Sequence, residues 1–509
     1  MADSFLPLPL PFSSHSSGDD HLPSRALCIM VLGTSSHAGK SWLATALCRW
    51  YSNRGYQVAP FKAQNMSNNA RVVATPDGGQ GEIGSAQYFQ ALAARTVPDV
   101  RMNPLLLKPE ADTRSQVVLL GQVSDTFTHM PWRERGPYLW PVLAQALDAL
   151  CTENDVVVIE GAGSPAEINL HDSDMVNMRV ARHVQAHCLL VCDIDRGGAF
   201  AHLYGTWALL PPSEQALIRG FVLNKFRGDA ALLEPGPQML HDLTGVPVVA
   251  TIPMLWQHGL PEEDGIFHSA APASGTVSPK AARTRIAIVA YPRISNLDEF
   301  QPLHNVAGVQ LVWARTVADL ADADWVILPG SKATVADLHW LRQQGLDRAI
   351  ADHAAQGRRV LGICGGLQML GEALVDSHGV DGNAPGLGLL PLVTQFTPDK
   401  TVRHSQVRMG PLTGAWQALS GLELHAYEIH HGQTAVHPAM LAAGQGVQTA
   451  MEGLAWANAS GHVLGCYLHG LFESAAVLQA LFGAQAQDMD AVFDRLAAGV
   501  DSWFARPAA

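Results

Sequence analysis

The residues best suited to covalent chemistry surround a cysteine in a glycine-rich turn. Cys364 lies in "LGICGGLQML" (361–370), where an apolar run meets a Gly-Gly pair and then a helix-like segment. A nucleophile elbow needs this order of strand, tight turn and helix, because only small neighbours permit a turn that exposes the sulfur. The helix N-terminus behind the turn favours the thiolate, the reactive form of cysteine. We predict that Cys364 is a nucleophile; a buried packing cysteine is the alternative.

A thiolate nucleophile needs an acid–base partner and donors for the oxyanion that it creates. "GCYLHG" ends a later apolar run and places His469 at the same expected sheet edge as Cys364. "LPGS" (328–331) ends another run, so the backbone N–H groups at Gly330 and Gly365 are the expected oxyanion donors. The pattern predicts a catalytic pair, Cys364 and His469, with an oxyanion hole beside it.

A second constellation, "GTSSHAGKS" (33–41), has the residue types that bind phosphate. Backbone N–H groups of such a loop point at phosphate oxygens, and the helix N-terminus and the lysine add positive charge. The strict Walker pattern would have glycine at position 34, where this chain has threonine, so the match is to an extended P-loop. The expected nucleotide contacts in this loop are Thr34, Ser35, Gly39, Lys40 and Ser41.

Carboxylates at the ends of two further apolar runs could hold the Mg²⁺ that accompanies a bound nucleotide. Glu160 ends "VVVIE", and Asp193 begins "DIDRGGAF" after "HCLLVC". In open α/β sheets, ligands bind beyond the carboxyl ends of the strands. We predict Ser41, Glu160 and Asp193 as metal ligands, with helix caps or salt bridges as the alternative. Asn224, in "NKFRGD", is a weaker candidate for the purine edge.

One polar loop has an unusual content of amides. "FKAQNMSNNA" (61–70) follows a strand-like segment, and its side chains can donate to carboxylates or carbonyls of a ligand. From composition alone, a solvated loop and a binding loop are equally compatible with it. The candidate substrate contacts are Lys62, Gln64, Asn65 and Asn68.

Continuous apolar runs set the positions of the elements that must hold these residues. The runs cover 26–33, 155–161, 187–193, 220–225 and 246–253, then 285–292, 323–331, 358–366 and 462–470. Unbroken rather than alternating runs indicate strands that are covered on both faces. Helical stretches such as 40–55 lie between them. We therefore predict an α/β fold with two doubly wound, mainly parallel sheets.

The segment 269–283 loses all periodicity and is rich in Ala, Ser, Pro and Gly, which predicts a linker. It separates a nucleotide-binding domain over 26–268 from the cysteine-bearing domain over 284–480. A disordered tail is expected at 1–25 and a helical tail at 481–509, where "QDMDAVFDRLAAGVDSWF" has an amphipathic pattern.

The overall composition excludes several classes of protein. The 509 residues carry a formal net charge of −13 without a Lys/Arg run, which argues against a nucleic-acid surface. Seven scattered cysteines without a paired framework fit a reducing compartment. There is no signal-peptide pattern and no apolar run long enough to span a membrane, so we expect a cytoplasmic protein.

The second domain resembles the class I, triad-type glutamine amidotransferases. The resemblance implies that Cys364 attacks the side-chain amide of glutamine, forms a γ-glutamyl thioester and releases ammonia, with His469 as its partner. In that family a glutamate two residues after the histidine orients it, but this chain has Leu471 there. "HGLF" is similar to the branch of these enzymes that shows only the Cys–His pair by motif, and Glu473 lies two residues further on.

The first domain resembles dethiobiotin-synthetase-like ATPases, and the fusion resembles the cobyric acid synthase family. The motifs that carry this resemblance are "KAQNMSNN", "EIGSAQ", "MNPLLLKP", "GAGSPAEINL", "DIDRGGAF", "NKFRGD", "YPRISNLDEF", "GICGGLQMLG", "YEIHHGQT" and "YLHGLFES". The resemblance implies ATP- and glutamine-dependent amidation, with Mg²⁺, of the b, d, e and g carboxylates of cobyrinic or hydrogenobyrinic acid a,c-diamide. It makes the 61–70 loop a candidate corrinoid contact.

Two other interpretations share part of this pattern. A cobyrinic acid a,c-diamide synthase has both domain types, although "KAQNMSNN" and "YPRISNLDEF" favour the first reading. A P-loop switch ATPase with a non-catalytic amidotransferase-like module is an alternative from another class. The intact Cys364 and His469 argue against it.

Overall fold

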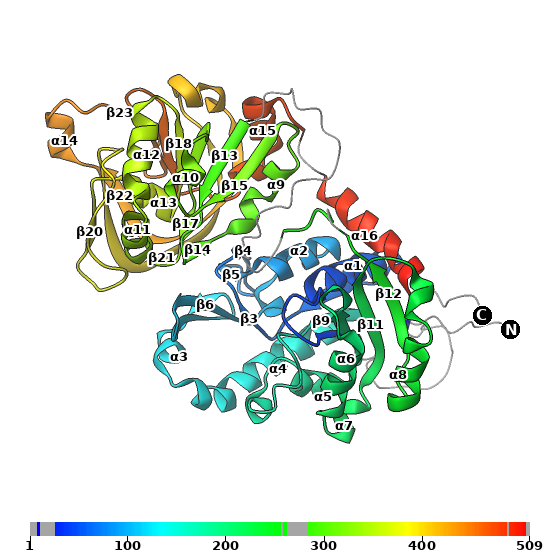
Figure 1. Cartoon of the computed structure of the whole chain (residues 1–509). Coiled ribbons are helices and arrows are strands. Elements are labelled where there is room, and N and C mark those ends of the chain that lie inside the picture. The colour runs from blue at the N-terminus through cyan, green and yellow to red at the C-terminus, as the bar shows by residue number, and fades with distance from the viewer. Residues whose placement is uncertain (1–7, 11–25, 256–257, 262–283, 486–487, 505–509) are drawn as a thin grey trace.

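Two parallel sheets with helices packed on them organise the chain (Figure 1). The computed structural model describes residues 8–10, 26–255, 258–261, 284–485 and 488–504. The predicted linker at 269–283 lies outside these ranges. The predicted N-terminal tail, residues 1–25, also lies outside them except for residues 8–10. In that short stretch Leu8 is buried, and the Pro9 carbonyl accepts a hydrogen bond from the Tyr51 hydroxyl, so this part of the expected tail is packed.

The first sheet contains six parallel strands in the order β12-β11-β10-β1-β9-β2. Their bounds are Leu27–Gly33 (β1), Val58–Phe61 (β2), Val156–Glu160 (β9), His187–Asp193 (β10), Ile218–Phe226 (β11) and Val248–Pro253 (β12). Alternate residues of β1 enter separate cores on the two faces, Met30 and Leu32 on one face and Ile29 and Val31 on the other. Burial on both faces explains why these strands are continuous apolar runs.

The order of the strands determines what can meet the P-loop. Since β1 lies between β9 and β10, the loop that follows Gly33 begins beside the ends of both neighbours. Glu160 ends β9 and Asp193 ends β10. The P-loop and the two predicted carboxylates therefore share one sheet edge, as expected for ligand sites in this architecture.

The rest of the first domain covers this sheet and extends beyond it. Its helices are Lys40–Ser52 (α1), Ser85–Ala93 (α2), Asp125–His129 (α3), Gly136–Glu153 (α4), Met178–Val184 (α5), Ala199–Ala208 (α6), Pro212–Gln215 (α7) and Gly236–Thr244 (α8). Two small sheets are formed by Gln64–Met66 (β3), Leu105–Ala111 (β6), Arg114–Leu119 (β7) and Gln122–Val123 (β8), and by Ala70–Ala74 (β4) and Gln80–Gly84 (β5). The amide-rich segment 61–70 therefore contains β3 and the residues that lead into β4.

The second domain has a seven-stranded sheet in the order β15-β13-β16-β18-β25-β24-β23, in which all pairings are parallel except those of β24 with β25 and with β23. Its strands are Thr284–Val289 (β13), Val309–Ala314 (β15), Trp325–Leu328 (β16), Arg359–Ile363 (β18), Val447–Met451 (β23), Ala455–Asn458 (β24) and Val463–Cys466 (β25). Its helices are Gln301–His304 (α9), Val317–Leu320 (α10), Thr334–Gln343 (α11), Leu346–Ala355 (α12), Gly365–Leu370 (α13), Pro438–Ala442 (α14) and Ala475–Phe482 (α15). Cys364 follows β18, and His469 lies three residues beyond the neighbouring β25.

A smaller sheet lies against this domain, with strands Ala373–Asp376 (β19), Ala384–Pro385 (β20), Leu392–Arg408 (β21) and Glu423–Val436 (β22). A short ladder, Ile294–Ser295 (β14) with Gly330–Ser331 (β17), precedes a 3-10 turn, Leu297–Phe300 (η6). Ser331 of the ladder lies beside Gly365, the residue after the cysteine, and η6 carries Glu299 beside His469. The apolar runs predicted neither β14 nor η6.

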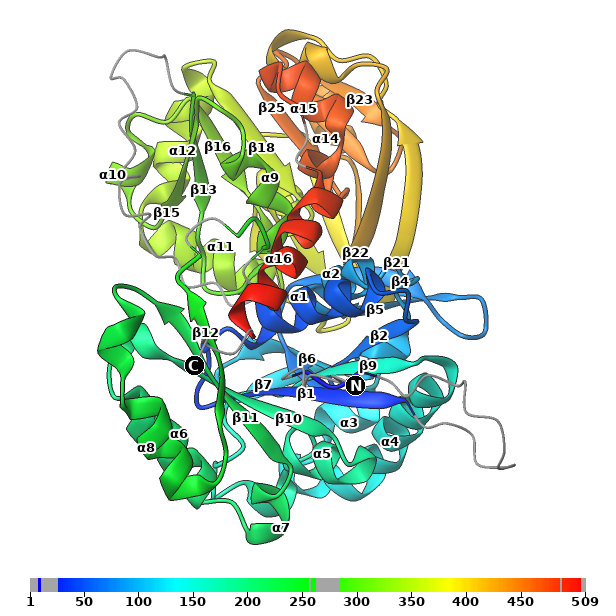
Figure 2. The same ribbon diagram turned by 90° about the vertical axis from the view of Figure 1, so that its right-hand side faces the viewer.

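The last helix, Met489–Trp503 (α16), leaves the second domain and packs on α1 of the first (Figures 1 and 2). The amphipathic pattern predicted this helix, and its apolar face is buried through Val492, Phe493, Leu496, Ala497 and Val500. Among the described residues, no helix is long and apolar enough to cross a membrane. None of the seven cysteines, all of which lie in the described ranges, forms a disulfide.

Candidate active sites

Cys364 occupies a strained turn of the nucleophile-elbow kind. Its backbone has φ 52° and ψ −108°, in a region that side-chain-bearing residues rarely adopt. A Cβ at Gly366 would overlap the Leu328 carbonyl oxygen, so the turn requires a glycine at that position. The Sγ atom lies 3.5 Å from the Ile429 carbonyl oxygen, and the residue is 6% exposed. Strain retained at a small, buried turn favours a chemical role for Cys364 over a packing role.

His469 lies beside Cys364 and is held by a carboxylate from a distant part of the chain. The Nδ1 atom is 3.1 Å from Glu299 Oε1, and the Gly470 backbone N–H donates to Glu299 Oε2 at 3.2 Å. Tyr427 stacks on the imidazole with the ring centroids 5.3 Å apart. Glu299 therefore holds the ring through Nδ1, which is the contact that a triad carboxylate makes.

The surroundings of His469 keep it protonated. Burial lowers the pKa of His469, but Glu299 and the contact with Cys364 outweigh burial and raise that pKa to about 10. Burial raises the pKa of Glu299, while His469 and the Gly470 N–H act in the opposite direction. An imidazolium next to a cysteine sulfur can stabilise a thiolate and later give its proton to a leaving amine.

The predicted oxyanion glycines meet at this centre. A Cβ on Gly330 would lie 3.1 Å from His469 Cε1, and a Cβ on Gly365 would lie 2.8 Å from the Ser331 backbone nitrogen. The loop 330–331 therefore packs directly against both His469 and the start of α13. Their role as oxyanion donors remains a prediction.

The loop between β1 and α1 has the contacts of a phosphate-binding loop. Lys40 Nζ donates to the Ser35 and Gly163 carbonyl oxygens at 3.0 and 3.1 Å, so its charge is held over the loop. Gly39 has φ 102°, and a Cβ there would overlap the Asn224 amide. Asn224 itself donates to the Ala38 carbonyl oxygen at 2.7 Å. Its amide therefore supports the loop backbone in this structure, a contact that the sequence did not suggest.

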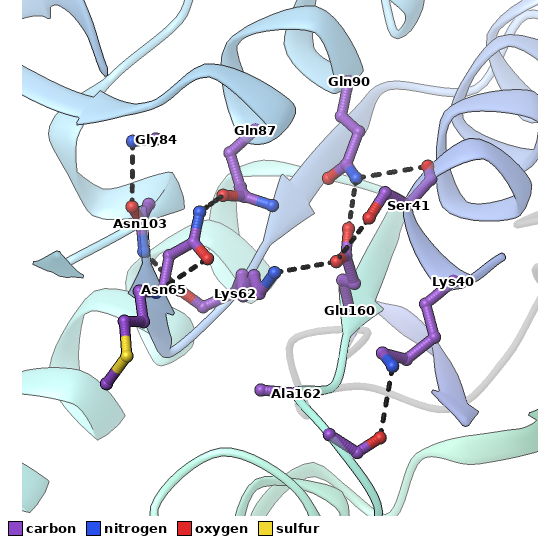
Figure 3. A network of polar contacts seen from close by, with 12 residues as sticks. Lys40, Ser41, Lys62, Asn65, Gly84, Gln87, Gln90, Asn103, Glu160 and Ala162 are labelled. Carbon is purple, nitrogen blue, oxygen red and sulfur yellow. Dashed lines mark hydrogen bonds and ion pairs between the residues drawn. The ribbon is translucent and has the colours of Figure 1, made fainter. Parts of the chain in front are cut away.

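Glu160 is the centre of a buried polar network at the P-loop (Figure 3). It accepts hydrogen bonds from Ser41 Oγ at 2.9 Å, Lys62 Nζ at 2.8 Å and Gln90 Nε2 at 2.6 Å. Burial by itself raises the pKa of Glu160, but Lys62 and the hydrogen bonds outweigh it and the pKa is lowered. Glu160 is therefore an ionised carboxylate in contact with the serine of the P-loop.

Hydroxyl and carboxylate oxygens are the protein ligands that Mg²⁺ prefers, so Ser41 and Glu160 fit this ion by chemistry and position. Asp193 lies on the other flank of β1. Its carboxylate accepts from Lys225 Nζ at 2.8 Å and from the Asp195 backbone N–H at 3.0 Å. The described residues contain no group of three or more His, Cys, Asp or Glu side chains arranged for a metal. Substrate phosphates and water would complete the coordination of an ion at such a site.

The four predicted substrate residues lie beside this network, and three of them, Lys62, Asn65 and Asn68, hydrogen-bond to different partners. Lys62 is 5% exposed and binds Glu160, while Asn65 Nδ2 donates to Gln87 Oε1 at 3.2 Å. Asn68 Nδ2 donates to the Pro109 carbonyl oxygen at 3.3 Å. Five buried polar atoms in this region have no hydrogen-bond partner among the described residues: Gln64 Oε1, Asn68 Oδ1, Ser85 Oγ, Gln87 Nε2 and Gln90 Oε1. Such a concentration of unpaired groups is expected where a polar ligand binds.

Sequence reasoning missed several residues of these sites. Glu299 lies 170 residues before His469, so no local spacing could reveal the contact. It belongs to "YPRISNLDEF", a motif whose position after β13 was the available signal. Glu473, which stands closer to His469 in sequence, pairs instead with Arg71. Gln90 was also missed because it reaches the P-loop from α2.

Comparisons with known proteins agree with both halves of the structure. A family model for the "CobQ/CobB/MinD/ParA nucleotide binding domain" matches residues 29–261, and one for the "CobB/CobQ-like glutamine amidotransferase domain" matches residues 285–477. A cobyric acid synthase of Paracidovorax citrulli is 73% identical over 483 residues, covering 94% of this chain and 97% of that protein. Cobyric acid synthases of Variovorax paradoxus and Leptothrix cholodnii are 70% and 64% identical, covering 94% of this chain and 97% and 95% of those proteins.

The fold and the two sites define a class of protein in which a P-loop nucleotide-binding domain is fused to a glutamine amidotransferase domain. This is the organisation of a glutamine-dependent ligase, and the chain is an enzyme of that class. Within the class, it belongs to the cobyric acid synthase family.

Proposed function

We propose that this enzyme amidates the b, d, e and g side-chain carboxylates of adenosylcobyrinic or hydrogenobyrinic acid a,c-diamide to give cobyric acid. The observation that carries the proposal is the identity of 64–73% with cobyric acid synthases along nearly the whole chain. The two buried polar centres supply the residues for both halves of such a reaction: Cys364, His469 and Glu299 for ammonia release, and the P-loop with Glu160 for carboxylate activation.

Ammonia release begins when the Cys364 sulfur attacks the side-chain carbonyl carbon of glutamine. The N–H groups at Gly330 and Gly365 receive the oxyanion of the tetrahedral intermediate. His469, protonated and oriented by Glu299, donates its proton to the leaving nitrogen, so that ammonia departs and the thioester remains. Water then hydrolyses the thioester, which releases glutamate and regenerates the sulfur.

Carboxylate activation takes place at the P-loop. The γ-phosphoryl group of ATP is transferred to a carboxylate oxygen of the corrinoid, which gives an acyl phosphate and ADP. Lys40 and the loop N–H groups stabilise charge on the transferring phosphoryl, and Mg²⁺, held by Ser41 and Glu160, supplies further charge neutralisation when it is bound. Ammonia attacks the acyl carbon, phosphate leaves, and the amide forms.

The polar cluster around the 61–70 loop is the proposed contact with the corrinoid side chains. Lys62 Nζ lies 2.8 Å from Glu160, so a carboxylate held by this loop is close to the phosphate site. Gln64 and Asn68 each present a buried oxygen without a partner among the described residues. Flexible amide donors and acceptors suit a site that must accept several similar carboxylates in turn.

A cobyrinic acid a,c-diamide synthase is the alternative within the same class. The curated relatives named as cobyric acid synthases favour the first assignment. A switch ATPase with an inert second domain is disfavoured by the strained Cys364 and the protonated His469, which have no evident use in a binding module.

Replacing Cys364 with serine tests the division of labour between the two centres. The C364S variant should lose glutamine-dependent amidation, because serine cannot serve as the thiolate, but should keep activity with an added ammonium salt. Product formation with each nitrogen source, followed by chromatography and mass spectrometry, is the measurement. Equal loss with both sources would show that Cys364 has a structural role.

A complementary variant tests the nucleotide-binding domain. Lys40→Ala removes positive charge from the P-loop and should abolish amidation from glutamine and from ammonia alike. Normal amidation by this variant with ammonia would contradict the proposed role of the loop.

A further inference from the structure

A buried arginine of the nucleotide-binding domain reaches into the glutaminase centre. Arg71 lies in β4 and is 2% exposed. Its Nε donates to Asp298 Oδ2 at 2.8 Å, and its Nη2 also contacts this carboxylate and lies 2.6 Å from Glu473 Oε1. Both carboxylates belong to the amidotransferase domain. Burial opposes the charge of Arg71, but the two carboxylates outweigh burial and hold its pKa well above the usual value.

The partner Asp298 is the chain neighbour of Glu299, the residue that holds His469. The preceding residues of the same turn are also tied to the first domain. The Leu297 backbone N–H donates to Asn69 Oδ1 at 2.9 Å, and Asn296 Nδ2 donates to the Ala70 carbonyl oxygen at 3.3 Å. Three consecutive residues, 69–71, therefore fix the turn that carries Glu299.

Arg71 also contacts the aromatic ring that stacks on the imidazole. Its Cζ lies 5.1 Å from the ring centroid of Tyr427, the ring that stacks on His469. The Tyr427 hydroxyl accepts from Asn296 Nδ2 at 3.0 Å. Arg71 therefore contacts Tyr427, which stacks on His469, and Asp298, the chain neighbour of the residue that bonds to His469.

The segment that ends at Arg71 begins at the nucleotide site. Lys62 binds Glu160, which accepts a hydrogen bond from Ser41 of the P-loop. Ten residues of chain, 62–71, thus connect the carboxylate at the nucleotide site with the turn that orients the glutaminase histidine. A displacement of this segment on ligand binding would reach both centres.

We propose that Arg71 is a positioning residue for the Glu299–His469 pair, and that segment 62–71 makes ammonia release depend on the occupancy of the nucleotide and acceptor site. The proposal rests on the roles proposed above for Cys364 and His469. The first domain thereby completes the glutaminase centre of the second.

The test uses a charge-neutral pair of substitutions, Arg71→Met with Asp298→Asn. Arg71→Met alone would leave the Asp298 carboxylate buried without its partner, which could unfold the interface. In the double variant that carboxylate is gone, and the side chain of Glu473, 37% exposed, can be hydrated. Glutamate release at saturating glutamine is measured across pH with and without ATP and corrinoid, and ammonia-dependent amidation reports on the first domain.

We expect glutamate release by the double variant to fall roughly tenfold to a hundredfold, since misplacement of a catalytic group by about 1 Å has effects of this size. The alkaline limb of its pH profile should move to lower pH, because a displaced Glu299 supports the His469 proton less well. Stimulation by ATP and corrinoid should disappear, while ammonia-dependent amidation stays within about twofold of the wild type.

Asp112→Asn is the matched control, because it removes an ion pair between the domains, Arg293–Asp112 at 2.6 Å, that does not reach Glu299. It should leave all of these readouts unchanged. Unaltered glutamate release by the double variant, or a parallel loss of glutamine- and ammonia-dependent activity, would overturn the proposal. Wild-type glutamate release by C364S would instead refute the proposed function, since that readout needs no assumption about the acceptor.

Discussion

Glu299 lies beside His469. In triad-type amidotransferases the corresponding carboxylate belongs to a glutamate two residues after the histidine. Here that sequence position is Leu471, which is buried in the core of the domain. The carboxylate comes from a turn after the first strand of the same domain, and it bonds to the imidazole and to the Gly470 N–H. The proposed catalytic array of Cys364, His469 and Glu299 is therefore assembled from three distant segments.

Glu299→Gln tests this assignment at the scale of one residue. Without the carboxylate, only the contact with Cys364 opposes the effect of burial, so the pKa of His469 should fall from about 10. The imidazole would then lose its proton at a lower pH than in the wild type, and the alkaline limb of glutaminase activity should move down accordingly. We expect kcat to fall by about 10² to 10⁴. A kcat and a pH profile like those of the wild type would contradict the role of Glu299.

The sequence alone predicted a candidate site residue where neighbouring residues form a recognisable motif. The Gly-rich turns at Cys364 and Lys40 are such patterns, because a tight turn or phosphate loop is formed by neighbours in sequence. Asn224, Gln90 and Glu299 act through contacts between distant segments, and no spacing in one sequence reveals such contacts. The purine contact expected of Asn224 stays a prediction, since in the structure its amide binds the Ala38 carbonyl oxygen.

At the scale of elements, the continuous apolar runs predicted most strands of both central sheets because these strands are buried, whereas β2, β15, β23 and β24 are not among those runs. The smaller sheet was missed for the opposite reason. Its long strand β21 includes "DKTVRHSQVR", which is polar and largely exposed along one side. β14 and β17 have only two residues each, too few for a pattern. Even so, β14 leads into the turn that carries Glu299, and β17 packs against Gly365.

Phe493→Ala tests the packing of α16 on α1. The ring is 2% exposed in a core shared with Leu43 and Leu47, so truncation should cost about 3–5 kcal/mol in the free energy of unfolding. Denaturant unfolding of the full chain, followed by tryptophan fluorescence, is the measurement. Asp488→Ala, which removes only the N-cap contact with the Asp490 N–H, should cost about 1 kcal/mol. A smaller effect for Phe493→Ala than for this control would contradict the packing.

At the scale of the whole molecule, buried ion pairs hold the two domains face to face. Besides Arg71, Glu82 of β5 accepts from Lys108 of its own domain at 2.8 Å and also contacts Lys400 of the other domain. Lys332 pairs with Glu110 at 2.7 Å across the same interface. The C-terminal helix then returns to the first domain (Figure 2). This arrangement suits the proposed passage of ammonia from one centre to the other without loss to water.

The most direct measurement of the central claim follows nitrogen through the entire enzyme. The protein is incubated with ATP, Mg²⁺, amide-¹⁵N glutamine and cobyrinic or hydrogenobyrinic acid a,c-diamide, and the corrinoid is analysed by mass spectrometry. We predict a product with four new ¹⁵N amides, formed only when ATP is present. A corrinoid that gains no label, while the enzyme releases glutamate, would contradict this prediction.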